Sequence, residues 1–382
     1  MKVNSLKLLY FRNYDGVNLN FHSSLNIFVG NNANGKTNII EALFLMSLGK
    51  SFRAKSDVEC IKIGEMATCV SCNLTKDNIQ KDIMLAINNK GKNIKVSGIK
   101  RNKIYEFVGE LNTVLFSPDD LQLIKGSPSI RRSFIDREFY QFSKIYHKYS
   151  LIYKHILKQR NSFLKNMRKN KNDNNLKSYL EVLSLQLAKL SLYITKKRYE
   201  FIQKISKIAS ENVMKISDNN EVLEIRYKSS ILEALQTPYS KINSIDEKMV
   251  CNAMMDKFKD DILYGSTKIG IHHDDLIFLI NGLEAKKYAS QGQQKTIVLA
   301  LKLAEIEFLK NSTGTFPILL LDDVLSELDK IRQKKLLDII DSKIQTFITT
   351  PTLNDIKKEF LENSNIFYIK EGKIYNNLVS EE

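Results

Sequence analysis

The chain has 382 residues and a net charge of +15 at neutral pH, a length that predicts two to three domains and is ample for a hydrophobic core. Its 43% hydrophobic residues and five prolines exclude a disordered chain. Four cysteines are too few for a disulfide framework, and no apolar run approaches the ~18 residues of a membrane span, so we expect a cytoplasmic protein with no membrane partner. The positive charge favours an acidic substrate or nucleic acid, although lysine is abundant throughout and the charge alone is weak evidence.

The first third of the chain is predicted to contain strands and turns around one glycine-rich loop. The N-terminus has an apolar patch but no small-residue cleavage site, so we expect a strand there and not a signal peptide. Apolar patterns predict strands at 6–11 and 17–21, and the continuous apolar run at 25–29 indicates a strand buried on both faces. A helical apolar pattern follows the loop at 39–46. Between 79 and 96, two alternating runs joined by Asn-Asn-Lys-Gly indicate a hairpin.

The middle third has a helical pattern. From Phe142 the apolar positions recur with a period close to a heptad, are interrupted by the polar stretch 168–175, and resume from Leu176 to Ile208. We expect two antiparallel helices of roughly 30 to 35 residues each, which at ~1.5 Å per residue gives a hairpin about 50 Å long.

The last third returns to alternating strands and helices. Strands are predicted at 277–280, 318–321 and 347–350, and helices at 293–309 and 330–340. Strands and helices on both sides of a helical insert indicate an α/β fold, with one parallel-sheet domain built from the two ends of the chain. The predicted segments are 1–118 for the first part of this domain, 119–271 for a largely helical second lobe, and 272–382 for the remainder of the domain.

The glycine-rich loop carries the strongest functional signal. It matches G-x-x-x-x-G-K-[ST] between a buried strand and a helix, the setting in which backbone N–H groups surround phosphates. We expect Lys36 to reach the β- and γ-phosphates of ATP and the Thr37 hydroxyl to bind Mg²⁺. The predicted nucleotide-binding residues are Gly30, Asn31, Asn32, Ala33, Asn34, Gly35, Lys36, Thr37 and Asn38.

Two further segments extend this prediction. The apolar strand at 318–321 ends in Asp322 and Asp323; Asp322 is placed to hold Mg²⁺, and Asp323 to orient or deprotonate an attacking water. Such an acidic pair alone could equally cap the next helix. The turn Ser290-Gln291-Gly292-Gln293 opens a predicted helix, where its hydroxyl and amides can bind a phosphate, although Ser290 could be an ordinary N-cap.

Other chemistry-bearing residues have simpler interpretations. Cys69 and Cys72 have a C-x-x-C spacing without a second pair, so we favour small strand residues over a zinc or redox site. His272 and His273 on one strand would point to opposite faces and could not easily share a metal ion. Tyr14 either stacks on adenine or is an ordinary core or surface aromatic.

Together these motifs resemble an ABC-type ATPase head. The turn at 290–293, which precedes the Asp322 strand, resembles the signature motif of such heads and is called the signature turn below. Ser326–Asp329, just after that strand, is similar to their D-loop. The resemblance implies that Ser290, Gly292 and Gln293 contact ATP bound by a second copy of the chain, with Asp323, Lys36 and Ser290 as catalytic residues. Lys36 and Asp322 are too close in sequence for the long coiled-coil arms of SMC proteins.

Within this class the chain resembles the RecF family of bacterial recombination mediators, an SMC-like branch, over essentially its whole length. The segments that carry the resemblance are Phe11–Tyr14, Gly35–Asn38, Phe116–Leu121, Lys125–Pro128, Arg131–Asp136, Gly270–Leu276, Tyr288–Lys295 and Leu320–Asp329. The resemblance implies an ATP-dependent homodimer on duplex, gapped or junction DNA that helps load RecA at single-strand gaps with RecO and RecR, in DNA repair, replication and the SOS response. It also implies a weak, DNA-stimulated ATPase that acts as a release switch.

Two positions depart from the wider ABC pattern. Asp323 replaces the glutamate of transport ATPases, from which we infer slow hydrolysis, and Pro351 follows the strand at the point where transporters have a histidine. The predicted DNA contacts are Arg53, Lys55, Arg131, Arg132, Arg168 and Lys169. The alternative functions are an ABC-head structural module with little turnover, or a P-loop enzyme that acts on small phosphates.

Overall fold

A parallel sheet lies at the centre of the molecule. The computed structural model describes the chain except for residues 22–23, 170–174, 340–342, 355, 357 and 376–382. Five strands of this sheet are parallel, and β15 is antiparallel at one edge. Their spatial order is β15 (Lys373–Tyr375), β14 (Ser364–Lys370), β3 (Leu25–Val29), β13 (Thr346–Thr350), β12 (Ile318–Asp322) and β8 (Thr113–Phe116). The α/β fold assembled from both chain ends is therefore confirmed.

An antiparallel sheet packs over one face of the parallel sheet, and the two share a core with α1 (Lys36–Leu48). Its spatial order is β2 (Tyr14–Asn20), β1 (Lys2–Phe11), β4 (Ala67–Lys76), β5 (Ile79–Asn88), β6 (Gly91–Val96) and β7 (Ile99–Arg101). The predicted hairpin is present, because β5 and β6 pair antiparallel with Asn88 opposite Gly91. Every residue of β3 and β12 is buried, as expected for strands covered on both faces.

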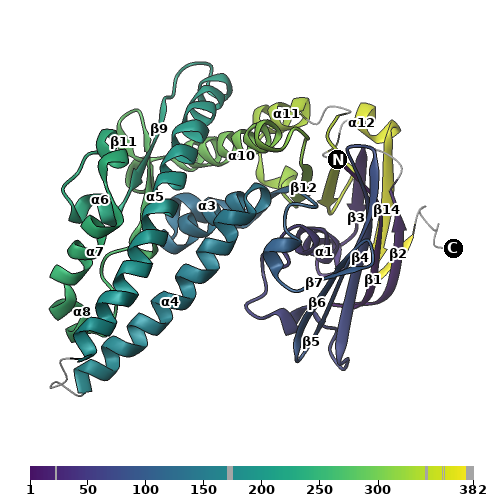
Figure 1. Ribbon diagram of the computed structural model, residues 1–382. Coiled ribbons are helices and arrows are strands. Elements are labelled where there is room, and N and C mark those ends of the chain that lie inside the picture. The colour runs from purple at the N-terminus through teal and green to yellow at the C-terminus, as the bar shows by residue number, and fades with distance from the viewer. Residues whose placement is uncertain (22–23, 170–174, 340–342, 355, 357, 376–382) are drawn as a thin grey trace.

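Helices cover the other face of the parallel sheet and form a second lobe with its own small sheet, on the left of Figure 1. The small sheet has the order β11 (Leu283–Glu284), β10 (Asp275–Ile280) and β9 (Leu223–Lys228). The helices on this side are α2 (Gln122–Lys125), α3 (Pro128–Phe142), α4 (Lys144–Lys169), α5 (Asn175–Ile216), α6 (Ser230–Ala234), α7 (Glu247–Asp256), α8 (Phe258–Tyr264), α9 (Ala285–Tyr288), α10 (Gln291–Thr313) and α11 (Lys330–Ile339). Helix α12 (Lys358–Glu362) lies apart from them, beside β14 at the upper right of Figure 1.

The helical hairpin of α4 and α5 differs from the sequence expectation in its lengths. The first helix has 26 residues and the second 42, instead of 30 to 35 each. The longer α5 extends past α4 because its second half packs against α10 and β9. The sequence placed a segment boundary at 271/272, which here separates β9 from its antiparallel partner β10.

Candidate nucleotide-binding site

The phosphate loop follows β3 and ends at the first turn of α1. Ala33 and Gly35 have positive φ values of 69° and 107°, so the chain reverses direction within the loop. A Cβ on Gly30 would lie 2.3 Å from the backbone oxygen of Ile369, and one on Gly35 would lie 2.6 Å from the Asn13 side chain. Glycine is therefore required at both positions, by close backbone approach at Gly30 and by conformation and space at Gly35.

The ammonium group of Lys36 lies inside this loop. It donates to the backbone oxygens of Gly30, at 2.7 Å, and Asn31, at 3.3 Å. A cavity of about 190 Å³ opens at the loop. It is lined by Asn32, Ala33, Gly35, Lys36, Thr37, Asn38, Arg53 and Asp323. The cavity brings most of the predicted phosphate-binding residues together with one of the two predicted carboxylates.

Thr37 and Asp322 meet although 285 positions separate them in the sequence. The Thr37 hydroxyl donates to Oδ1 of Asp322 at 2.8 Å, and the Thr349 hydroxyl at the end of β13 donates to the same oxygen at 2.9 Å. Burial raises the pKa of Asp322 above its ordinary value, and the two hydroxyl donors oppose that rise. A hydroxyl and a carboxylate so placed are the oxygen ligands that Mg²⁺ prefers.

Asp323 occupies the adjoining position with a left-handed backbone, φ 52°. Its backbone N–H donates to the Thr349 hydroxyl at 2.9 Å, which fixes this conformation. Its Oδ1 is buried, with no hydrogen-bond partner among the described residues. Thr349 therefore contacts both carboxylate residues from the strand that lacks the transporter histidine, a role that the sequence did not indicate.

A buried carboxylate behind the loop was also missed. Glu41 in α1 is fully buried and accepts from Arg12 Nε at 2.9 Å, Arg12 Nη2 at 2.6 Å and Arg53 Nη2 at 2.7 Å. Burial works to raise the pKa of Glu41, but the donors Arg12, Ser51 and Arg53 outweigh it and leave the pKa below its usual value. The signal in the sequence was an acidic residue within an otherwise apolar helix.

The turn between β1 and β2, with the first residue of β2, is hydrogen-bonded to the phosphate loop and the start of α1. Tyr14 is fully buried, and its hydroxyl donates to the backbone oxygen of Gly35 at 3.0 Å. The Asn13 amide donates to Asn34 O at 3.1 Å and accepts from the Asn38 amide at 2.7 Å. Of the two interpretations of Tyr14, the structure places it in the core and not at a base-stacking surface.

The signature turn does not line the cavity of its own chain. Ser290 is the N-cap of α10: its hydroxyl accepts from Gln293 N at 3.2 Å, and Gln293 Oε1 accepts from Ser290 N at 3.0 Å. Ser290 and Gln291 are exposed, so the N-terminus of α10 is accessible from outside the chain.

The predicted DNA-contacting residues separate into three groups. Arg53 lines the nucleotide cavity, and Lys55 close by is exposed. Arg131 is only 4% exposed and pairs with Asp275 at 2.7 Å, so its charge is used inside the helical lobe. Arg132 is half-buried. The side chains of Arg168 and Lys169 lie outside the described residues.

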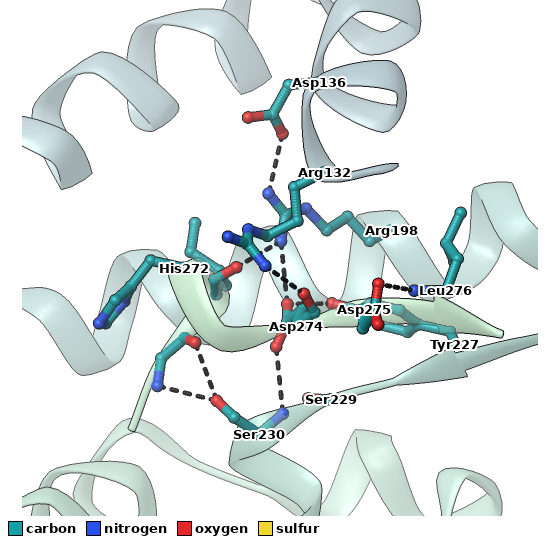
Figure 2. Close-up of polar contacts among 12 residues, drawn as sticks. Arg132, Asp136, Arg198, Tyr227, Ser229, Ser230, His272, Asp274, Asp275 and Leu276 are labelled. Carbon is teal, nitrogen blue, oxygen red and sulfur yellow. Dashed lines mark hydrogen bonds and ion pairs between the residues drawn. The ribbon is translucent and has the colours of Figure 1, made fainter. Parts of the chain in front are cut away.

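A buried network centred on Arg198 occupies the helical lobe (Figure 2). Arg198 of α5 donates to Asp136 Oδ1 and Asp274 Oδ2, both at 2.9 Å, while Arg132 donates to Asp274 O at 2.8 Å. Burial raises the pKa of Asp274 above its usual value against the opposing effect of Arg198. The network joins α3, α5 and the small sheet. The polar residue Asp274, just before β10, is therefore used in contacts inside the lobe.

The histidine pair has a different backbone from the one expected. His272 and His273 lie in a 3₁₀ turn (Ile271–His273), not in a strand, and both Nε2 atoms are 3.0 Å from Thr267 O. Cys69 and Cys72 lie in β4, with Cys72 buried. The described part of the chain contains no cluster of three or more His, Cys, Asp or Glu side chains that could hold a metal ion. None of its helices combines the length and apolar character needed to cross a membrane.

Comparisons with known proteins agree with this geometry. The RecF/RecN/SMC N terminal domain model matches residues 2–374. The chain is 40% identical over 386 residues to the DNA replication and repair protein RecF of Enterococcus faecalis (strain ATCC 700802 / V583), covering 99% of each chain. It is 43% identical to RecF of Streptococcus gordonii (strain Challis), covering 98% of this chain and 100% of the relative.

Solved structures show the same similarity. The recombination mediator protein RecF-ATP in the RecFOR pathway is 34% identical with a TM-score of 0.89, covering 98% of this chain and 97% of the other. An Smc head bound to the C-winged helix domain of ScpA is 17% identical with a TM-score of 0.54, over 100% and 98% of the two chains, a likeness of fold alone.

Proposed function

Since this chain belongs to the RecF family of DNA replication and repair proteins, we propose that it binds ATP as a dimer on DNA and releases the DNA after hydrolysis. The observation that carries the proposal is the meeting of the phosphate loop with the Asp322 strand, in which Thr37 Oγ1 and Asp322 Oδ1 are 2.8 Å apart. Two segments from opposite ends of the chain thus meet at the carboxyl ends of parallel strands, which supports a phosphate- and cation-binding role for this edge.

The residues at this edge fit ATP and Mg²⁺. The loop amides and Lys36 would bind the β- and γ-phosphates, and Thr37 and Asp322 would hold Mg²⁺. An Mg²⁺ ion held by Thr37 and Asp322 would supply positive charge to offset the negative charge that develops on the phosphates. Asp323 lines the cavity, where its carboxylate would orient a water molecule and accept its proton. Aspartate reaches less far than glutamate, from which we infer weak turnover.

The signature turn supports a composite site. Its Ser290 and Gln291 are exposed, and the turn does not line the cavity of its own chain. The N-terminus of this 23-residue helix is suited to bind the γ-phosphate of a second copy. In a symmetric dimer each ATP would lie between the loop of one copy and Ser290, Gly292 and Gln293 of the other. ATP would then shift the monomer–dimer equilibrium towards the dimer only as far as it binds the dimer more tightly than the monomer.

DNA binding would involve a basic face of α4. Helix α4 contains no aspartate or glutamate in 26 residues, and Lys148, Lys158 and Lys165 are exposed at helical spacings that place them on one face. Lys55 lies near the nucleotide loop and remains a candidate contact. Such a surface would bind phosphates without reading bases, which suits gapped and junction DNA. With RecO and RecR as partners, the dimer would help to load RecA at gaps and serve the SOS response.

The proposal is tested with a fluorescent gapped duplex. We expect tighter binding with ATP and Mg²⁺ than without them, and stimulation of ATP turnover by the DNA. A plot of the logarithm of the binding constant against the logarithm of the salt concentration has a slope set by the number of phosphate contacts. In the triple Lys148→Gln, Lys158→Gln, Lys165→Gln variant the magnitude of this slope should fall by about one for each lost phosphate contact. The matched control on α5 replaces Lys189, Lys204 and Lys207, which are also exposed. DNA affinity independent of nucleotide would contradict the proposed switch.

A further inference from the structure

The signature turn and the D-loop are joined within one chain by Arg332. This residue lies in the first turn of α11, directly after the D-loop. Its Nη2 atom donates to the backbone oxygen of Gly292 at 2.9 Å and to the Thr296 hydroxyl at 2.6 Å. Its Nη1 atom pairs with the Asp329 carboxylate, the last residue of the D-loop. One guanidinium therefore contacts the signature turn, the helix behind it and the D-loop.

Both ends of this connection are fixed. Asp329 Oδ1 accepts from Arg332 N at 2.9 Å, and the Thr296 hydroxyl donates to Gly292 O at 3.1 Å. Partial burial works to raise the pKa of Asp329, but the Arg332 backbone and guanidinium outweigh it and hold the pKa below its usual value. The Arg332 side chain is 19% exposed, so solvent screens these contacts only in part.

A second cation connects the same two segments in the opposite direction. Lys295 of α10 donates to the backbone oxygen of Glu327 in the D-loop. It holds the D-loop through one residue, Glu327, whose carboxylate also lies 3.8 Å from the Lys295 Nζ atom, whereas Arg332 reaches two groups of α10 through a planar, fixed fork. Arg332 is thus the residue whose loss frees the signature turn most directly.

We infer that Arg332 is a positioning residue that holds the signature turn in register with the D-loop, so that both segments meet the nucleotide of the second copy together. The inference rests on the proposed ATP-dependent dimer. Arg332 does not line the nucleotide cavity of its own chain, so its replacement acts on assembly and not on nucleotide capture.

The first experiment measures ATP-dependent dimerisation in the Asp323→Asn background, which slows turnover. Arg332→Gln raises the dimer dissociation constant at least tenfold, and Arg332→Lys gives an intermediate value because an ammonium group keeps the charge but not the fork. Lys334→Gln is the matched control: Lys334 is exposed on the same helix, and the expected change is under twofold. Binding of a fluorescent ATP analogue by each monomer stays within twofold of the parent.

The second experiment mixes variants. A Lys36→Ala copy keeps a working signature turn, and an Arg332→Gln copy keeps a working phosphate loop, so their mixed dimer contains one intact composite site. Mixing raises ATP turnover above the sum of the separate variants. Lys36→Ala mixed with Asp323→Asn gives no gain, because both changes damage the phosphate-loop side of a site.

The outcomes separate the two proposals. Dimerisation of Arg332→Gln at the parental affinity, or loss of nucleotide binding by its monomer, overturns the positioning role. An absence of gain in the Arg332→Gln mixture overturns it as well. If the unmodified protein itself shows no ATP-dependent dimer, the proposed function fails first, and the inference falls with it.

Discussion

Replacement of Glu41 tests whether the buried carboxylate behind the phosphate loop stabilises the fold. Glu41→Gln keeps the size of the side chain and removes its charge. The amide can accept on one oxygen only, and its N–H₂ group would face Arg12 or Arg53, which are themselves donors. Arg12 would lose its bidentate partner in the turn that supports the loop.

The expected loss follows from the contacts. Removing one member of a buried ion pair costs about 3 to 5 kcal/mol. The Arg12 side chain is 21% exposed and Arg53 is 36% exposed, so the contribution of Arg53 is screened and discounted. Because the retained amide preserves one acceptor, we expect the free energy of unfolding to fall by about 3 kcal/mol.

Urea unfolding at pH 7 measures this change directly. Glu65→Gln is the control: Glu65 is exposed, and its loss should alter the free energy of unfolding by under about 0.5 kcal/mol. Because the pKa of Glu41 is lowered in the folded chain, its contribution is present above the ordinary carboxylate pKa and lost as the pH falls below it. A loss below about 1 kcal/mol at pH 7 would show that the buried Glu41 carboxylate contributes little to the stability of the fold.

Three further changes have defined outcomes. Gly30→Ala places a Cβ 2.3 Å from Ile369 O and should weaken binding of a fluorescent ATP analogue at least tenfold; unchanged affinity would mean that the loop adapts. Burial lowers the pKa of His147 to about 4, so the folded state loses stability as the pH falls from 6.5 towards 4. Urea unfolding measures how far the free energy of unfolding falls between pH 7 and pH 5, and in His147→Phe this fall should be smaller by about 2 kcal/mol. An equal pH dependence in the variant would contradict that shift. Arg160→Leu leaves Asp261, 1% exposed, without its ion-pair partner and should cost about 3 to 5 kcal/mol in the same assay; a neutral effect would show that the lobe tolerates the unpaired carboxylate.

The sequence predicted the parts of the site that depend on local pattern. A buried strand followed by a glycine-rich loop, and a second buried strand ending in Asp322 and Asp323, were each visible within ten residues, and the structure brings them together. Thr349 was missed because a threonine at the end of a strand has no signature of its own. Its role comes from the parallel pairing of β12 and β13.

Long-range partners account for the other differences. Arg131 looked like an exposed cation at a helix start, but Asp275, 144 positions later, pairs with it inside the helical lobe. The strand before the signature turn was identified correctly, yet its pairing with β9 could not be inferred, since an apolar alternation does not specify its neighbour. The segment boundaries at 118 and 271 and the assigned roles of the site residues stay predictions.

The composite site is tested most directly by the molar mass of the Asp323→Asn protein, measured by light scattering after size exclusion with and without ATP and Mg²⁺. We expect the mass of a single 382-residue chain without nucleotide and twice that mass with it. Ser290→Arg, which blocks the signature turn, should abolish the doubling while ATP binding persists. A chain that stays monomeric with ATP, even when gapped DNA is added, would contradict the composite site.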